Sequence, residues 1–310
     1  AGPSQRNTDG LCGGKRLIKR SSLAKINLFL HVTGRRSDGF HDLFSLMTKI
    51  GLADDMAFGF HGRGIQVTCD HPAVPGDETN LVHRAAALFS AWCEKALKPV
   101  PGEGVCIHIK KQIPVGGGLG GGSSNAATVL TVLNERYSRP FSQGQLVQMG
   151  RCLGADVPFF LFHGPALAAG VGEKLTPVSN LPFCHVLLCD PGIQVPTARV
   201  FKGHDFCLTS HKKYTIKSVS DALLQGQGVD IGQYLHNDLE GSAFRLYPEI
   251  RSTKEEMERL LQRPVTMSGS GGCLFALYAE HKDALQGCEM LCRQWPAGEK
   301  NLFVTALQNS

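Results

Sequence analysis

The chain of 310 residues is long enough for one large domain or two ordinary ones, and its 42% hydrophobic and 19% charged residues are typical of a globular protein. The formal net charge of +5 is mildly basic, with no basic run long enough to indicate nucleic-acid binding. No apolar stretch approaches the roughly 18 residues of a membrane span. We therefore expect no nucleic-acid or membrane partner, and a monomer or a weak homodimer.

The first residues, "AGPSQRNTDGLCGG", have no apolar core of the kind that a signal peptide needs. We expect residues 1–16 to be a disordered tail, or one added for expression, outside the fold. The predicted location is cytoplasmic. A plastid stays open as the alternative, because no clear transit segment is present.

A β-rich start over residues 16–32 is followed by a turn signal, Asp38-Gly39. Strand-like runs continue to about residue 69. The apolar residues of 80–97 recur at helical spacing and predict a helix. Residues 104–115 alternate as a strand does and lead directly into a run of glycines.

The second half of the chain begins with a short predicted helix, 142–154, that ends at Gly154. The apolar run 157–162 contains Pro158 and is interpreted as a buried strand. From about residue 181 the order is strand, helices, Gly-rich turn, strand, helix and strand, which indicates a small α+β layer. We place a domain boundary near residue 180, giving domains 17–180 and 181–310.

Eleven cysteines stand at irregular spacings without a C-x-x-C pair, and their odd number leaves at least one unpaired. Several lie in apolar runs, such as Cys106 in "VCIHI" and Cys273 in "CLFAL", where a free cysteine packs as a small hydrophobic residue. This usage favours a reducing, cytosol-like compartment over a disulfide framework.

The stretch "KKQIPVGGGLGGGSSNAATVL", residues 110–130, packs six glycines into seven positions and then turns into an alanine-rich apolar run. Glycines let the backbone wrap an anion, and the N–H groups and dipole of a following helix attract negative charge. Ser123, Ser124 and Asn125 are good N-cap types for that helix. The pattern favours a phosphate site over a slack linker.

Two common phosphate motifs fit the loop poorly. Gly117 and Gly122 have the spacing of a Walker A loop, but Ser123 stands where its lysine belongs, which rules that motif out. Gly116, Gly118 and Gly121 match the dinucleotide fingerprint. A dinucleotide-binding fold also needs an acidic residue at the end of a second strand. Glu135 is the only candidate, and it falls in a predicted helix.

Five motifs in chain order resemble those of the GHMP small-molecule kinases. "PVGGGLGGGSSNAA" is similar to the phosphate loop of that family, and "SGSGGCLFAL" (268–277) is similar to its C-terminal glycine motif. "LAKINLFLHVTGRRSDGFHDL" (23–43), "LGADVPFF" (153–160) and "PGIQVPTARVFK" (191–202) resemble one branch of the family. That branch acts on a methylerythritol joined to cytidine diphosphate, in the non-mevalonate route to isoprenoids.

The resemblance implies an α+β fold of two domains, a β-rich N-terminal α/β domain and a ferredoxin-like C-terminal domain, with the active site in the cleft between them. ATP would donate its γ-phosphate to the 2-hydroxyl of the methylerythritol unit, with Mg²⁺ assisting. The resemblance leaves the Mg²⁺ ligands unassigned, with Ser123 or Ser124 as candidates.

The resemblance also implies roles for single residues. Lys25 would be the catalytic lysine, and Asp156 would orient or deprotonate the attacking hydroxyl. Asn27 would contact the substrate. The ATP phosphates would lie against the loop Pro114, Val115, Gly116, Gly117, Gly118, Leu119, Gly120, Gly121, Gly122, Ser123 and Ser124.

For the cytidine part, the resemblance implies that Phe40 stacks on the cytosine ring and that His41 hydrogen-bonds its edge. Phe201 would face the ring from the other side, and Thr197 would support the substrate. The family usually has Tyr where this chain has Phe40, so a ring face is kept and a phenol oxygen is lost.

Plainer interpretations of these residues stay open on the sequence alone. Lys25 is compatible with an ordinary charge at a strand start, Asp156 with turn chemistry, and the phenylalanines with plain core packing. Alternative functions are another GHMP kinase, acting on mevalonate, homoserine or a sugar, a nucleotide-binding protein without catalysis, and, more remotely, a dinucleotide-binding oxidoreductase.

Overall fold

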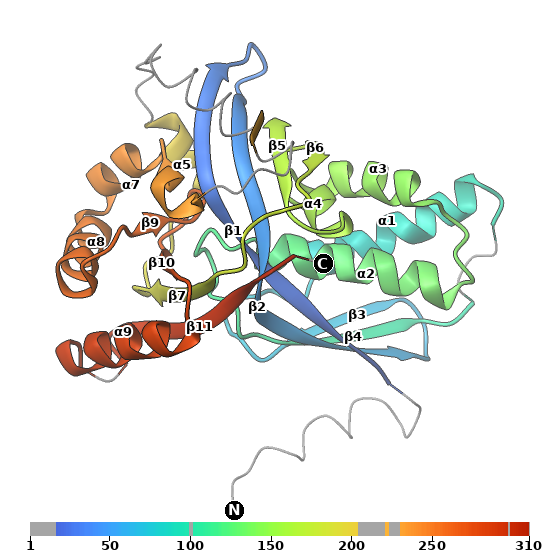
Figure 1. Ribbon diagram of the computed structural model, residues 1–310. Helices are drawn as coiled ribbons and strands as arrows, with labels where there is room; N and C mark the ends of the chain where they lie inside the picture. Colours follow the sequence, from blue (N-terminus) through green and yellow to red (C-terminus); the bar gives the residue numbers. More distant parts are fainter. Residues whose placement is uncertain (1–16, 99–101, 204–220, 223–229, 297, 310) are drawn as a thin grey trace, which may run out of the picture. The chain divides into compact units, whose positions relative to one another are not determined.

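The structure is a computed structural model that describes residues 17–98, 102–203, 221–222, 230–296 and 298–309 (Figure 1). The predicted tail, 1–16, lies outside the described residues. The chain forms two compact units, each assembled from separate segments. Unit 1 takes 1–22, 53–112 and 121–161, and unit 2 takes 23–52, 113–120 and 162–310. The contiguous domains 17–180 and 181–310, with a cleft between them, stay a prediction.

Two long paired strands, β1 (Ile18–Arg35) and β2 (His41–Phe60), contribute residues to both units. The turn that joins them is closed by the Arg36 N–H, which donates to the Phe40 carbonyl at 2.9 Å. Gly39 has a φ of +86°, a conformation that glycine adopts at little cost. The turn predicted at Asp38-Gly39 is confirmed.

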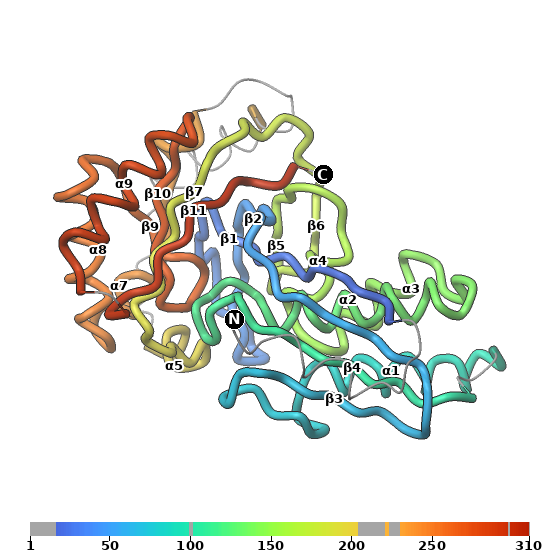
Figure 2. Tube along the Cα trace, turned by 90° about the horizontal axis from the view of Figure 1, so that it is seen from below, coloured from blue at the N-terminus to red at the C-terminus, as the bar shows by residue number. Residues whose placement is uncertain are grey.

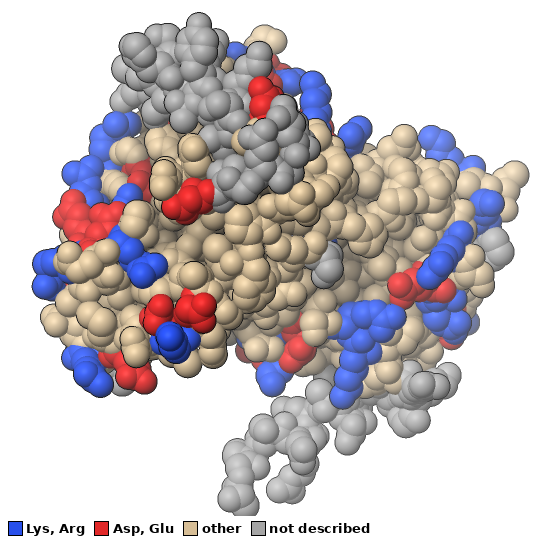
Figure 3. Space-filling model, in the orientation of Figure 1, with Lys and Arg blue, Asp and Glu red and all other residues tan. Residues whose placement is uncertain are grey.

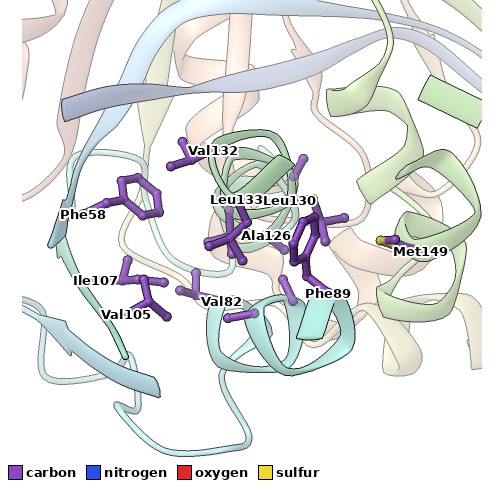
Figure 4. Close-up of a cluster of buried hydrophobic side chains, with 14 of the residues drawn as sticks. Phe58, Val82, Phe89, Val105, Ile107, Ala126, Leu130, Val132, Leu133 and Met149 are labelled. Carbon is purple, nitrogen blue, oxygen red and sulfur yellow. The ribbon is translucent and has the colours of Figure 1, made fainter. Parts of the chain in front are cut away.

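The described part of unit 1 contains a small sheet and four helices. β4 (Val105–Lys110) pairs in parallel with β3 (Ile65–Cys69) and antiparallel with Asp55–Phe60 of β2. The helices are α1 (Leu81–Lys95), α2 (Gly121–Arg136), α3 (Gln143–Leu153) and α4 (Val157–Leu161). Apolar residues from these strands and helices share one buried core, including Phe58, Phe89, Ile107, Leu130 and Met149 (Figure 4).

The ends of the helices follow local chemistry. Asn80 caps α1 by accepting a hydrogen bond from the Val82 N–H at 2.9 Å, and Ser142 forms a capping box with Gln145 at the start of α3. Both predicted helices, 80–97 and 142–154, are confirmed within a few residues.

Two local predictions were wrong. Residues 157–161 form helix α4 rather than a strand, because Pro158 occupies the first turn, where its missing N–H breaks no helical hydrogen bond. Helix α2 begins at Gly121, so Ser123–Asn125 lie inside its first turns instead of capping it. The Ser124 side chain is buried and accepts a hydrogen bond from the Ser22 hydroxyl at 2.7 Å.

Unit 2 is built on an antiparallel sheet. β11 (Asn301–Gln308) pairs with β2 on one side and β7 (His185–Asp190) on the other, and β10 (Leu274–Tyr278) and β9 (Thr266–Met267) follow. β5 (Ala166–Gly170) joins residues 43–47 of β2 to β6 (Lys174–Pro177). β8 (His236–Asn237) runs parallel to β1.

The helices of unit 2 cover this sheet. α9 (His281–Gln294) packs on β7, β10 and β11, and α8 (Pro248–Leu261) lies beside α9 (Figure 2). α5 (Thr197–Lys202) contacts α7 (Glu240–Leu246), and the one-turn helix η1 (Ile231–Tyr234) precedes β8. The buried side chains form two clusters centred on residues such as Ile26, Phe275, Val200 and Met257.

Charged side chains of both signs are interspersed on the face shown in Figure 3. On α8 and α9 they form exposed pairs such as Arg293 with Glu289, 3.8 Å apart, which contribute little to stability. Among the described helices, none combines the length and apolar character that crossing a membrane demands.

The nine described cysteines are all free. Burial raises the pKa of the Cys189 thiol to about 12 and the pKa of Cys273 well above its usual range. These two thiols therefore stay neutral near pH 7 and pack as apolar groups. The reducing compartment stays a prediction.

Candidate active site

Lys25 lies on β1 within a chain of buried polar groups. Its side chain is 4% exposed, and its Nζ donates to the Asn27 Oδ1 at 2.6 Å. The Asn27 Nδ2 in turn donates to the Ser45 Oγ at 2.8 Å, and that hydroxyl donates to the Phe29 carbonyl at 2.6 Å. A buried ammonium is costly unless hydrogen-bonded, so Lys25 is not an ordinary solvated charge at a strand start.

Residues 114–120 of the glycine loop lie against the backbone of Lys25 in unit 2. The Lys25 N–H donates to the Leu119 carbonyl at 3.0 Å, and the Leu119 side chain is buried. Gly116, Gly118 and Gly120 have φ values of +76°, +80° and +69°, which residues with a β-carbon rarely adopt. The loop is therefore a defined structure rather than a slack linker.

A second loop, residues 268–272, packs backbone to backbone on the first, and we call it the glycine turn. A β-carbon on Gly118 would overlap the Ser268 carbonyl oxygen, and one on Gly271 would overlap the backbone of Gly117 and Gly118. The Ser268 Oγ donates to the Gly118 carbonyl at 3.2 Å. The motif at 268–277 therefore packs on residues 114–120 of the glycine loop, and part of its glycine requirement comes from this close approach.

The glycine turn also approaches the lysine. Gly269 has a φ of +59°, and a β-carbon there would lie 3.2 Å from both the Lys25 Nζ and the Asn27 Oδ1. Two glycine loops and a buried ammonium thus come together within unit 2.

The rest of the predicted phosphate loop, Gly121–Ser124, forms the first turn of α2 in unit 1. The first four N–H groups of an α-helix have no intrahelical partner, and such an end attracts anions. The Ser124 hydroxyl is buried against Ser22, whereas Ser123 is only partly buried. Of the two serines, Ser123 is the more accessible.

Asp156 lies in unit 1, in the turn between α3 and α4. Its carbonyl accepts a hydrogen bond from the Phe159 N–H at 3.2 Å, and the next residue, Val157, donates to the Gly154 carbonyl at 3.2 Å. Val157 is fully buried while Asp156 is half-buried, so the turn is anchored beside the carboxylate. Lys25 belongs to unit 2, and the pairing of Lys25 with Asp156 stays a prediction.

The residues predicted to bind cytidine all lie in unit 2. The rings of His41, on β2, and Phe201, on α5, stack with centroids 5.3 Å apart and planes at 21°. Phe40 is 63% exposed and is therefore not a core aromatic residue. Thr197, at the start of α5, shares a hydrogen bond of 2.8 Å with the Ser270 hydroxyl of the glycine turn.

Comparison with known proteins assigns the family. The model for "GHMP kinases N terminal domain" matches residues 80–164, and that for "GHMP kinases C terminal" matches 219–297. A curated relative from Syntrophus aciditrophicus, named 4-diphosphocytidyl-2-C-methyl-D-erythritol kinase, is 38% identical over 88% of this chain and 94% of its own. The relative of the same name from Syntrophotalea carbinolica is 40% identical over 86% and 92%.

The chain belongs to the GHMP kinase family. Within that family it groups with the 4-diphosphocytidyl-2-C-methyl-D-erythritol kinases, as the motifs at 23–43, 153–160 and 191–202 predicted. The family assignment excludes the alternative of a dinucleotide-binding oxidoreductase.

Solved structures of GHMP kinases share the fold. A crystal structure of 4-(cytidine 5'-diphospho)-2C-methyl-D-erythritol kinase matches with a TM-score of 0.73 and 36% identity over 94% of this chain and 100% of that one. A homoserine kinase from Cytophaga hutchinsonii matches with a TM-score of 0.71 but 17% identity, a likeness of fold alone. The predicted α+β GHMP kinase fold is confirmed.

This GHMP kinase also carries a cluster of possible metal ligands, His31, His236 and Asp238. The His236 Nε2 lies 2.6 Å from one Asp238 oxygen, and the His31 Nδ1 lies 3.6 Å from the other. The two imidazole rings stack with centroids 4.7 Å apart and planes at 19°. Both imidazoles thus lie beside one carboxylate, with His236 closer to it than His31.

Two polar residues of the site were not predicted from the sequence. Ser45 is a single hydroxyl within the apolar run "LFSLM", and only the register of β2 against β1 brings it to Asn27. Ser270 lies within the glycine motif, but its link to Thr197 joins residues 73 positions apart. A lone polar residue inside an apolar strand was the available signal for Ser45.

Proposed function

We propose that this GHMP kinase transfers the γ-phosphate of ATP to the 2-hydroxyl of 4-diphosphocytidyl-2-C-methyl-D-erythritol, giving the 2-phosphate and ADP. This reaction belongs to the non-mevalonate route to isoprenoid precursors. The relatives at 38% and 40% identity support the substrate by their names. The observation that carries the chemistry is the buried Lys25 ammonium beside two interlocked glycine loops.

We assign ATP binding to the loop Pro114–Ser124. Its glycines at positive φ keep side chains away from the backbone, and the free N–H groups at the start of α2 favour a negatively charged group. The glycine turn packs on this loop through Ser268, which donates to the Gly118 carbonyl, and through Gly271, which lies against Gly117 and Gly118. Backbone donors are suited to a triphosphate because they are fixed before the ligand arrives.

Mg²⁺ prefers oxygen ligands and keeps several waters, usually with substrate phosphates completing its shell. Ser124 does not fit as a ligand, because its side chain is 3% exposed and its hydroxyl is engaged with Ser22. The partly exposed Ser123 hydroxyl does fit. When bound, the ion would offset the charge on the phosphate oxygens.

Phosphoryl transfer asks the protein mainly for positioning and charge stabilisation. Lys25 is held by Asn27 and, through it, by Ser45, so its ammonium is oriented to offset charge on the transferred group. Asp156 accepts the proton of the attacking hydroxyl or orients Lys25. Either role makes the two residues act as a unit.

We assign the cytosine ring to the aromatic residues of unit 2. Phe40 offers an exposed ring face. We assign the second face to Phe201, whose ring here stacks on the imidazole of His41. His41 supplies a ring nitrogen for the base edge. Phe40 lacks a phenol oxygen, so its contribution is stacking alone.

The runner-up is a GHMP kinase for another small alcohol. It rests only on likeness of fold, such as that to the homoserine kinase at 17% identity. The aromatic set and the higher identity to the cytidine-dependent kinases favour the first proposal. A cytoplasmic location and a monomeric or weakly dimeric state stay predictions.

The test is ATP-dependent phosphorylation of 4-diphosphocytidyl-2-C-methyl-D-erythritol with Mg²⁺, run beside the Asp156→Asn variant. Turnover by the wild type and a loss of at least two orders of magnitude in the variant support the proposal. Absence of turnover in the wild type, with ATP still bound, contradicts the substrate and leaves the family intact.

A further inference from the structure

The segment His236–Glu240, "HNDLE", contains strand β8 and leads into helix α7. Asn237 and Asp238 are residue types that commonly cap helices, but α7 begins at Glu240 with Leu239 in the cap position. The segment connects β1 to the glycine turn, and we call it the bracket. Its side chains point to a role that helix capping does not explain.

One side of the bracket is fixed to β1, the strand that carries Lys25. β8 pairs in parallel with β1, with Phe29 opposite His236. The Asp238 N–H donates to the Leu30 carbonyl at 2.9 Å, and one Asp238 oxygen accepts from the Val32 N–H at 3.0 Å.

The other side of the bracket holds the glycine turn, chiefly through Asn237. Its side chain is 4% exposed, and its Nδ2 donates to the carbonyls of Met267 at 2.8 Å and Gly269 at 2.6 Å. Its Oδ1 accepts from the Leu239 N–H at 2.9 Å. Both N–H donors of the Asn237 amide are thus engaged by the carbonyls of the two residues that flank Ser268.

Glu240 also binds the end of β9, at Met267. Its Oε1 accepts from the Met267 N–H at 2.9 Å, and its other oxygen pairs with Lys254 at 2.7 Å. Met267 is therefore held at its N–H by Glu240 and at its carbonyl by Asn237. The turn that follows has little freedom to shift.

We propose that Asn237 is a positioning residue for phosphoryl transfer, which sets the glycine turn against the ATP loop and against Lys25. The inference rests on the proposed function in one respect: the loop that the turn supports binds the ATP phosphates. Ser268, between the two carbonyls that Asn237 holds, donates to Gly118. Gly269 lies against the Lys25 ammonium. Loss of the Asn237 donors therefore moves both groups.

The test compares Asn237→Asp with wild type by the Kd for ADP and by kcat and KM for ATP. The substitution keeps the shape of the side chain and turns a donor toward two carbonyls into an acceptor. We expect ADP binding to weaken at least tenfold and kcat to fall at least tenfold. Protonation of the introduced carboxyl restores one donor, so the ratio of variant to wild-type kcat should rise as the pH falls from 8 to 6.

Asn134→Asp is the matched control. Asn134 is also a buried asparagine, whose amide donates to the Phe141 carbonyl at 3.0 Å, but it lies in unit 1, in the last turn of α2. We expect it to lower the unfolding temperature while leaving the Kd for ADP and the pH profile unchanged. If Asn237→Asp does not fold, Asn237→Ser, which retains one donor, replaces it with the same expected direction.

Equal Kd, kcat and pH profile in a folded Asn237→Asp or Asn237→Ser variant and wild type overturn the proposal. Losses of the same size in Asn134→Asp also overturn it, because they would reflect stability alone. A wild type that binds ADP but does not phosphorylate the cytidine substrate refutes the proposed substrate and leaves the binding comparison decisive. A wild type that binds no ADP refutes both.

Discussion

The Nζ of Lys25 donates a hydrogen bond of 2.6 Å to the Oδ1 of Asn27, two residues along the same strand. Residues at i and i+2 of a strand share a face, so the sequence "AKIN" alone brings the ammonium and the amide together. The amide oxygen is directed to the lysine because the Nδ2 is engaged by Ser45. Asn27 therefore supports Lys25, the proposed catalytic lysine, and is itself a proposed substrate contact.

Ser45→Ala tests this support. The change removes the Ser45 partner of the Asn27 Nδ2 and one hydrogen bond to the Phe29 carbonyl in a buried setting, which costs about 1–3 kcal/mol of stability. It also frees the Asn27 amide to rotate away from Lys25. We expect kcat to fall about tenfold with a smaller change in KM for ATP, measured by steady-state kinetics beside urea unfolding. Unchanged kcat in a destabilised variant would show that Ser45 serves the fold only.

Lys25→Ala and Asp156→Asn test whether the two residues act as one unit. Each single change should reduce kcat by about two to four orders of magnitude. The double variant should lose little more than either single variant, because removing one residue already abolishes the catalytic contribution that the two make together. The measurement is kcat for all four proteins at saturating ATP. Losses that multiply in the double variant would mean that the residues act independently.

Gly271→Ala tests the interlocked loops. The new methyl group would overlap the backbone of Gly117 and Gly118, so the two loops must separate. We expect the Kd for ADP to rise at least tenfold, measured by calorimetry. Gly241→Ala, in helix α7, has nothing within 4 Å of the added carbon and is the matched control, expected to bind as wild type does. Tight ADP binding by Gly271→Ala would show that the loop contact is not needed for the nucleotide.

The hydrogen bond between Thr197 and Ser270 links the helix proposed to bind cytidine to the glycine turn, which packs on the loop proposed to bind ATP. A double-mutant cycle with Thr197→Val and Ser270→Ala measures whether this link matters. We expect each change to raise the KM of the cytidine substrate severalfold and the pair to be less than additive, because residues that share one contact couple. Strictly additive effects of the two substitutions on KM would show that the hydrogen bond between Thr197 and Ser270 does not contribute to substrate binding.

Alkaline stability follows from the buried thiols. The pKa of Cys189 is raised from 9.0 to about 12 by burial, and burial also raises the pKa of Cys273 well above its usual range. Between pH 9 and 12 the unfolded chain loses these protons while the folded chain keeps them, so unfolding is favoured as the pH rises. Each thiol contributes a fall of about 1.4 kcal/mol per pH unit. Their contribution to stability is thus complete below pH 9.

The measurement is the free energy of unfolding in urea at pH 8, 9.5 and 10.5 for wild type and Cys189→Ala. The variant is less stable at every pH because of the cavity, but its curve should fall less steeply above pH 9. Parallel dependences of the unfolding free energy on pH would contradict this account, because they would mean that the Cys189 thiol titrates alike in the folded and unfolded states.

The sequence identified the family because its motifs are short and continuous. "AKIN" and the glycine loop are contiguous, so the residues that approach each other there are neighbours in the chain. Helix α4 was misread as a strand because five apolar residues carry no period that separates a helix from a strand.

The remaining contacts depend on register and on loops that meet from distant parts of the chain. Ser45 reaches Asn27 through strand pairing, and Asn237 reaches Gly269 across 32 positions. No periodicity in a single sequence specifies such a pairing. The same is true of Gly271, whose need for a bare α-carbon arises from Gly117 and Gly118.

The most direct test of the central claim is a comparison of substrates under one set of conditions. Initial rates with ATP and Mg²⁺ are measured for 4-diphosphocytidyl-2-C-methyl-D-erythritol, for 2-C-methyl-D-erythritol without the cytidine diphosphate, and for mevalonate and homoserine. The account predicts turnover of the first and a kcat/KM at least a thousandfold lower for the others. Comparable turnover of the plain methylerythritol, or preference for mevalonate or homoserine, would contradict it.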